Sequence, residues 1–179
     1  MAVKTNKATG NVHQINGTPS ATQPQANVDR AAIRAELEAT RTAFHAFLNS
    51  LSAEQWRQQS PTNAWTMAEV VVHLTWALEQ LPQEIASARR GKGMFNFPKW
   101  LGEPLSYWYT RWLARNATPA ALGRRYDAAM TAVIQTLDEV QAGDWGLGAP
   151  FYGHGFYTIA ELFHTPRAHL AEHIGGREG

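Results

Sequence analysis

The chain has 179 residues, of which 44% are hydrophobic, and a formal net charge of +1. That length and composition suffice for one hydrophobic core, so a single folded domain is expected. Cysteine is absent, which excludes disulfides, thiolate metal ligands and a cysteine nucleophile. No apolar run is long enough to span a membrane, and no secretory signal pattern opens the chain. We therefore expect a cytoplasmic protein that has no membrane partner.

The basic residues are scattered along the sequence. The tightest group, Arg89, Arg90 and Lys92, has the position of a helix C-terminal turn, where cations complement the helix dipole. This distribution does not indicate a phosphate-binding patch, so nucleic acid is not expected as a partner.

Residues 1–27 are rich in Thr, Asn, Gln, Gly, Ala and Pro and show no apolar periodicity. Such a segment buries too little surface to offset the entropy of ordering, so a disordered tail containing His13 is expected, followed by a helical domain over residues 28–176. Asp29 is a suitable N-cap for the first helix. His45 lies beside the apolar stripe of that helix, which contains Ile33, Leu37, Phe44, Phe47, Leu48 and Leu51.

A second helix is expected to begin at Thr66, after the turn residues Pro61-Thr62-Asn63. Glu69 follows Thr66 by three positions, which is the spacing of a capping box. Gly91 and Gly93 end this helix. Its expected buried face contains Val70, His73, Leu74, Ala77 and Leu81. His73 therefore points inward, where a histidine is either a hydrogen-bonded packing residue or a ligand.

The connection from Met94 to Ala117 is crowded with aromatic residues, and a short helix from Pro104 to about Arg115 is expected within it. So many aromatic side chains indicate core packing, a dimer surface or a cover that contacts a substrate. The residues concerned are Phe95, Phe97, Trp100, Tyr107, Trp108, Tyr109 and Trp112.

A third long helix is expected after Thr118, an N-cap that is followed by Pro119. The apolar stripe of this helix contains Leu122, Tyr126, Ala129, Val133, Leu137 and Val140.

The glycine-rich stretch Gly143–Gly155 matches neither a dinucleotide-binding nor a P-loop fingerprint, and it brings Tyr152, His154 and Tyr157 to the start of the last helix. There, Thr158 and Glu161 have the spacing of a second capping box. Pro166 forces a kink or a restart with Thr165 as cap, and Gly175-Gly176 stops the helix. The whole pattern predicts an all-α, up-down-down-up four-helix bundle with a long crossover between its second and third helices.

Two histidines, His169 and His173, are four residues apart on the last helix and so lie about 40° apart around its axis. His164 lies about 140° from His169 and is not expected to be a ligand. An H-x-x-x-H pair alone is a weak signal. Together with His73 it offers three neutral imidazoles from two helices, a set that suits a divalent metal and leaves coordination positions open.

The segment Trp65–His73 resembles the W-[ST]-x-x-E-[VL]-x-x-H segment of the DinB-like superfamily, and the last helix with its H-x-x-x-H resembles that of the same superfamily. The resemblance covers roughly residues 29 to 174 and implies a four-helix bundle, often dimeric. It also implies a site for nickel, zinc, manganese or iron with His73, His169 and His173 as ligands. Characterised members include metal-dependent thiol S-transferases, so a low-molecular-weight thiol and a small electrophile are the implied substrates.

Other functions remain open at this point. A hydrolase would use the same metal with hydroxide, and Phe163–Pro166 resembles the colibactin-resistance branch of the superfamily. A stress-related binding protein would need no turnover. The sequence identifies no general base, because Glu69 is occupied by capping, and His154 and Tyr157 are only weak candidates.

Overall fold

A computed structural model describes residues 28–61, 64–93, 99–151 and 155–174, with only the backbone described for residues 99–106. Several predicted features lie outside these ranges: the tail over residues 1–27 with His13, the turn residues Thr62 and Asn63, the aromatic residues Phe95 and Phe97, Tyr152, His154, Gly175 and Gly176.

The first helix, α1, spans Arg30–Ser50 and begins at the predicted cap. The Asp29 carboxylate accepts a hydrogen bond of 3.0 Å from the backbone N–H of Ala32, one of the donors that a helix start leaves without a partner. Leu51 lies just beyond the helix end and is only partly buried. The rest of the predicted stripe is buried: Ile33, Leu37, Phe44, Phe47 and Leu48.

The second helix, α2, spans Met67–Ala88 and carries the predicted capping box. Glu69 accepts a 2.7 Å hydrogen bond from the Thr66 backbone N–H, and the Thr66 hydroxyl accepts one of 3.3 Å from Glu69. The prediction that only one face of this helix is buried was too narrow, because three consecutive residues, Val70–Val72, are at most 1% exposed. This helix contacts α3, α4, α5 and α6, and a helix with neighbours on several sides is apolar around most of its circumference.

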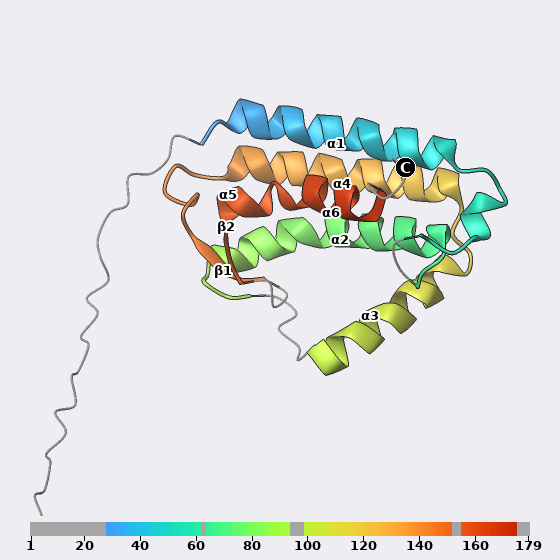
Figure 1. The fold of residues 1–179 in the computed structure, drawn as a ribbon. Coiled ribbons are helices and arrows are strands. Elements are labelled where there is room, and N and C mark those ends of the chain that lie inside the picture. The colour runs from blue at the N-terminus through green and yellow to red at the C-terminus, as the bar shows by residue number, and fades with distance from the viewer. Residues whose placement is uncertain (1–27, 62–63, 94–98, 152–154, 175–179) are drawn as a thin grey trace, which may run out of the picture.

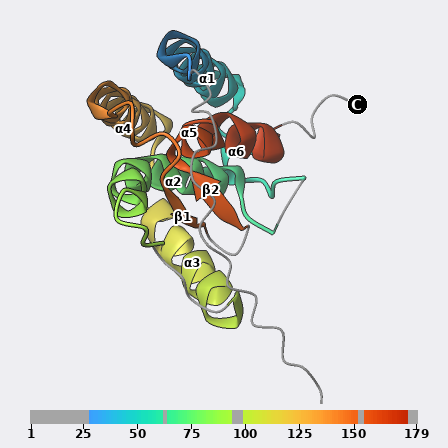
Figure 2. The same ribbon diagram turned by 90° about the vertical axis from the view of Figure 1, so that its left-hand side faces the viewer.

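The third and fourth helices are α3, over Lys99–Ala114, and α4, over Pro119–Glu139. The Thr118 side chain caps α4, as predicted, by accepting a 3.3 Å hydrogen bond from the Ala121 N–H. The helix α3 begins five residues before the predicted start at Pro104, because a proline costs a helix one backbone hydrogen bond but does not prevent a preceding turn. Figures 1 and 2 show α3 outside the bundle, on the α2 side.

Two short antiparallel strands, β1 (Gly148–Pro150) and β2 (Phe156–Thr158), and a 3₁₀ turn, η1 (Gln55–Arg57), were not predicted. In the strand pair, Gly148 faces Thr158. A Cβ atom added to Gly148 would lie 2.2 Å from the Tyr157 carbonyl oxygen, so the two backbones come this close only because position 148 has no side chain.

The last helical segment is divided into α5 (Ile159–Leu162) and α6 (Thr165–Ile174). The second capping box is present: Glu161 accepts a 2.8 Å bond from the Thr158 N–H, and the Thr158 hydroxyl accepts a 3.2 Å bond in return. The restart near Pro166 is confirmed. However, Thr165 is the first residue of α6 rather than its cap, and its hydroxyl donates to the Leu162 carbonyl at 2.7 Å.

The four long elements α1, α2, α4 and α5–α6 form the expected up-down-down-up bundle, and α3 returns the chain so that α4 runs parallel to α2 (Figure 1). The hydrophobic core lies between them. Within the described residues, no helix combines the length and the hydropathy that a membrane span requires.

Candidate metal centre

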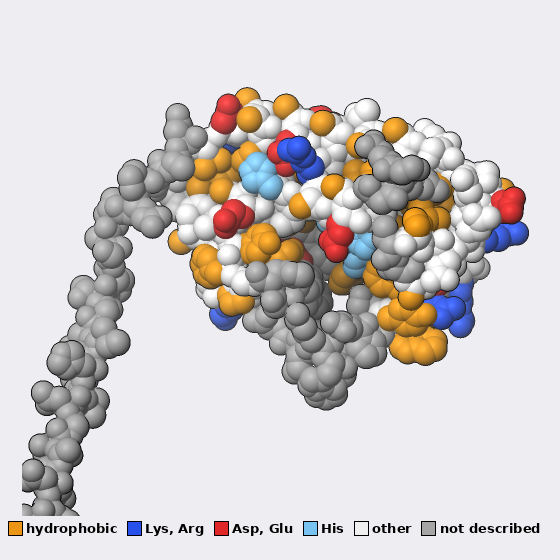
Figure 3. All heavy atoms as spheres, viewed as in Figure 1, with side chains coloured by type: hydrophobic (Ala, Val, Ile, Leu, Met, Phe, Trp, Pro, Cys, Tyr) orange, Lys and Arg blue, Asp and Glu red, His pale blue; other side chains and the backbone are white. Residues whose placement is uncertain are grey.

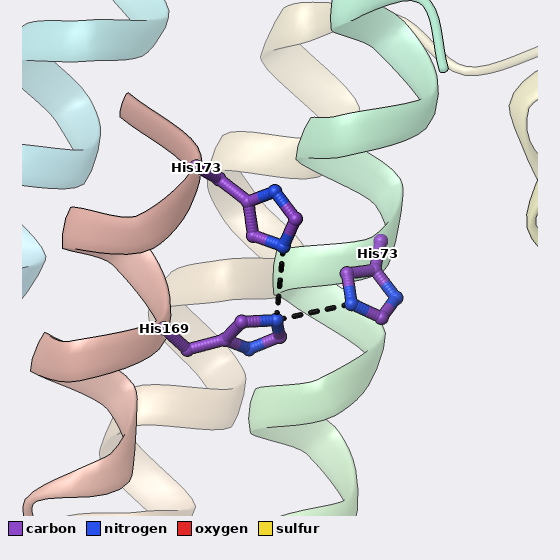
Figure 4. A group of neighbouring side chains, drawn as sticks. All are labelled: His73, His169 and His173. Atoms are coloured by element: carbon purple, nitrogen blue, oxygen red, sulfur yellow. Dashed lines mark hydrogen bonds between the residues drawn. The ribbon is translucent and has the colours of Figure 1, made fainter. Parts of the chain in front are cut away.

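Three histidine side chains from two helices converge inside the bundle (Figure 4). His73 comes from α2, and His169 and His173 come from successive turns of α6. The Nε2 atom of His169 lies 3.0 Å from Nε2 of His73 and 3.2 Å from Nε2 of His173. One nitrogen from each ring can be chosen so that all three atoms lie within 4.8 Å of one another. The structure therefore brings together all three residues that the sequence singled out.

The donor set fits a divalent cation. Two nitrogens that each lie about 2.0–2.1 Å from a tetrahedral zinc ion are about 3.3 Å apart, close to the two shortest spacings here. A neutral imidazole Nε2 has either one hydrogen or one lone pair, so His169 Nε2 cannot make full hydrogen bonds to both of its neighbours. If the three rings instead direct their nitrogen lone pairs at one shared cation, no hydrogen bond between the rings is needed.

Burial keeps the site in the protonation state that a metal needs. Burial, with a smaller contribution from the neighbouring His169 and His173 as like charges, lowers the pKa of His73 to about 3. Burial also lowers the pKa of His173. The Nδ1 atom of His73 is buried and has no hydrogen-bond partner among the described residues. At neutral pH both rings are uncharged, which is the form in which imidazole binds metals.

The indole of Trp65 forms one wall of the site. Its ring centroid lies 4.6 Å from that of His73 and 6.3 Å from that of His173, to which it is nearly parallel. Trp65 directly precedes the capping residue Thr66, so the start of α2 fixes the position of the indole. The site thus has an apolar surface beside its imidazoles, and all three of these histidines are only partly buried.

Glu69 lies one turn before His73 on α2 and links this part of the helix to α3. One oxygen, Oε2, accepts the capping hydrogen bond from Thr66, and the other, Oε1, lies 3.1 Å from Nε of Arg111. The same guanidinium donates a 3.0 Å hydrogen bond to the Tyr107 hydroxyl. Both carboxylate oxygens of Glu69 are therefore occupied, which agrees with the expectation that it is not a free base.

The remaining described histidines lie elsewhere. His45 Nε2 is 2.8 Å from the Asp127 carboxylate, so this ring links α1 to α4 and takes no part in the triad. His164 Nδ1 is 2.9 Å from the Glu36 carboxylate on α1 and takes no part in the triad. Tyr157 lies in β2, where its ring contacts Phe151 at 5.0 Å.

Sequence reasoning did not assign Trp65 and Arg111 to the site. Trp65 belongs to the segment that suggested the family, but an indole before a helix cap gives no separate signal for contact with a histidine. Arg111 reaches Glu69 only because α3 packs on α2, a tertiary contact that has no local pattern in the sequence.

A sequence model of the DinB superfamily matches residues 36–175, which is most of the chain. The chain belongs to the DinB superfamily. This confirms the family that the Trp65–His73 segment and the last helix suggested. No curated protein matches the chain.

Among solved structures, this DinB chain is similar to the colibactin self-resistance protein ClbS, crystallised in complex with a dsDNA. The TM-score is 0.55 at 11% sequence identity, over 82% of this chain and 95% of that one. At this identity the likeness establishes the all-α fold.

The exclusion of nucleic acid as a partner class is wrong. ClbS, which has this fold, forms a complex with double-stranded DNA. Net charge and sequence spacing failed as criteria because contacts to phosphates come from residues that the fold brings together, including backbone N–H groups. A formal charge of +1 over the whole DinB chain therefore excludes no such partner.

Proposed function

We propose that this protein is a divalent-metal-dependent enzyme that transfers a low-molecular-weight thiol to a small electrophile. The observation that carries the proposal is the convergence of three imidazoles, from His73, His169 and His173, whose Nε2 atoms approach within 3.0 and 3.2 Å. His73 and His173, with their lowered pKa values, are neutral at pH 7 and so available as ligands for nickel, zinc, manganese or iron.

Three neutral ligands leave the charge of a divalent ion uncompensated, so the site favours an anionic fourth ligand. A metal ion held there would lower the pKa of a bound thiol and present the thiolate to an electrophile. The chain has no cysteine, so the thiol must come from a separate small molecule. In the transfer, the S–H proton passes to solvent, the sulfur forms a bond to the electrophilic carbon, and the bond from that carbon to its leaving group breaks, so that the leaving group departs with the electron pair.

The residues around the triad suit an apolar electrophile. The Trp65 indole lies against the rings of His73 and His173 and offers a flat apolar surface beside the reacting atoms. Glu69 caps α2 and binds Arg111, so its proposed role is to hold α2 and α3 together beside the site. No described carboxylate is assigned as a general base.

A hydrolase is the second candidate. The same triad would serve it by activating water, and the observation that favours it is the set of three imidazoles, which leaves coordination positions open for a water molecule. Turnover of an ester, amide or strained ring by the metal-loaded protein, without any thiol, would support this candidate over the transferase. A non-catalytic binding protein would show neither activity.

The test uses protein loaded with cobalt or nickel, whose electronic spectrum reports on the ligands. Mycothiol, bacillithiol, glutathione and coenzyme A are each titrated in. At least one should produce a new thiolate-to-metal absorption band, and His169→Ala should abolish the band. His45→Ala is the matched control and should retain it, because that imidazole pairs with Asp127 and does not touch α6. A metal spectrum that none of the four thiols changes would contradict the transferase proposal.

A further inference from the structure

The C-terminal part of α3 and the N-terminal part of α4 form a segment without negative charge. Between Glu103 and Asp127 the sequence contains four arginines and no acidic residue. Two of the four are neutralised by contacts from α2: Arg111 by Glu69 at 3.1 Å, and Arg125 by Glu79 at 2.7 Å. The other two, Arg115 and Arg124, are exposed and have no ion pair among the described residues. This segment therefore carries two arginines whose charge is not paired within the described residues.

The same part of α3 exposes large aromatic rings. Trp108 is 67% exposed, Tyr109 44% and Trp112 62%. Trp108 and Trp112 are four residues apart and so share one face of the helix, and the rings of Tyr109 and Trp112 are nearly parallel at 6.2 Å. Arg115 follows Ala114, the last residue of α3, and its backbone N–H donates to the Trp112 carbonyl, so it lies at the same end of the helix as these rings. Figure 3 shows hydrophobic and basic side chains next to each other where α3 ends.

Large exposed apolar rings that lie together indicate a binding surface. The positive charge of the neighbouring arginines indicates which kind of partner binds there. A nucleic-acid strand offers both matching groups: phosphates for the arginines, and bases for the rings to stack on. A second copy of the chain fits less well, because a two-fold contact through this face would bring the unpaired arginines of both copies together. A duplex fits less well too, since its bases are already stacked on one another.

We propose that the α3 face formed by Trp108, Tyr109, Trp112 and Arg115 binds single-stranded nucleic acid. The rings stack on unpaired bases and Arg115 contacts a phosphate. Arg125 on α4, whose charge is paired with Glu79, lies close enough to Tyr109 to interact electrostatically with it, so α4 borders the face at this edge. The proposal is independent of the metal triad, none of whose residues belongs to this face.

The test measures fluorescence anisotropy with labelled 20-nucleotide strands of mixed sequence, single or double, at about 50–200 mM salt. The wild type should bind the single strand at least about tenfold more tightly than the duplex. Replacing both Trp108 and Trp112 by alanine should weaken single-strand binding by about tenfold or more, because stacking contributes about 1–3 kcal/mol per base. Arg115→Gln should reduce the slope of log K against log salt by about 1.

Matched controls separate this face from the rest of the surface. Phe156 is 63% exposed but lies on β2 and not on α3, so Phe156→Ala should leave binding unchanged. Arg90→Gln removes an exposed arginine that lies just after the C-terminal end of α2, and this variant should also leave binding unchanged. Circular dichroism verifies the fold of each variant.

Three results would overturn the proposal. The first is no binding of single strands at micromolar protein, and the second is full binding by the double tryptophan variant. The third is a wild-type dimer that the double variant converts to a monomer, with no strand bound by either. That third result would assign the face to a second copy of the chain.

Discussion

His73 and His169 are 96 positions apart in the sequence, and their Nε2 atoms are 3.0 Å apart in the structure. Each ring is placed by a local device of its own helix. The Thr66–Glu69 capping box fixes the start of α2 two turns before His73. The restart at Thr165 sets the phase of α6, so that His169 and His173 face α2 while His164 faces α1. The positions of the three imidazoles are therefore set by the residues at which α2 and α6 begin.

Removing any one of the three imidazoles should remove the metal. We expect His73→Ala, His169→Ala and His173→Ala each to lower the metal content of the purified protein by about tenfold or more, because two neutral ligands hold a divalent ion poorly. The measurement is elemental analysis of protein purified without an affinity tag. His45→Ala should retain the metal, since that ring binds Asp127. Metal content that is unchanged in all three variants would refute the site.

Without metal, the triad should make the protein less stable in acid. Burial lowers the folded-state pKa of His73 from 6.5 to about 3. Between these pH values the unfolded chain binds a proton that the folded state does not. The free energy of unfolding therefore falls as the pH decreases below 6.5, by up to about 1.4 kcal/mol per pH unit for one histidine. Above pH 6.5 this contribution to stability is fully present.

Urea denaturation in the presence of a chelator, at several pH values from 7 to 4, measures this effect. His73→Leu removes the titrating ring, so the variant should lose less stability than the metal-free wild type over this range. If both proteins lose stability with the same slope against pH, the His73 ring is not the group responsible.

Much of the bundle could be predicted because its signals are local. The two capping boxes, at Thr66 and Thr158, are hydrogen bonds between residues three positions apart, and both are present as expected. The apolar stripe of α4 also follows from helical periodicity alone, and its members Leu122, Tyr126 and Val133 are buried. The three site histidines could be singled out because they lie on stripes or at helical spacing.

What could not be predicted depends on contacts between distant segments. The strands β1 and β2 are three residues each, and β1 contains Gly148 and Pro150, which have low strand propensity, so the pairing is too short and its first strand too atypical to be recognised from the sequence. The burial of Val71 and Val72 results from the central place of α2, and the Glu69–Arg111 pair results from the packing of α3. None of these follows from periodicity within one element.

Glu36 on α1 should support the metal centre from outside it. Leu170 is the one buried residue of α6, so other contacts must help to hold this helix. The Glu36 carboxylate lies 2.9 Å from His164 Nδ1 and 3.5 Å from Arg167 Nη1, and both of these residues lie at the start of α6. Glu36→Gln should lower stability by about 0.5–1 kcal/mol and weaken metal binding a few-fold.

Competition with a chromophoric chelator measures the metal affinity of the Glu36 variant. Glu38→Gln is the control, since Glu38 pairs with Arg41 of its own helix at 3.2 Å and does not reach α6. Equal affinities in the two variants would mean that Leu170 and the neighbouring contacts position α6 by themselves.

Gly148 and Gly123 should respond in opposite ways to alanine. At Gly148 a Cβ atom would lie 2.2 Å from the Tyr157 carbonyl oxygen, so Gly148→Ala must push β1 and β2 apart and should cost about 1–3 kcal/mol. At Gly123, inside α4, the nearest atoms lie at 3.4 Å, on His45 and Leu48, so alanine fits with at most a small adjustment. There, the better helix propensity should raise stability by about 0.5–1 kcal/mol. Thermal unfolding of both variants checks the pair, and a stable Gly148→Ala protein would show that the strand pairing is not needed for the fold.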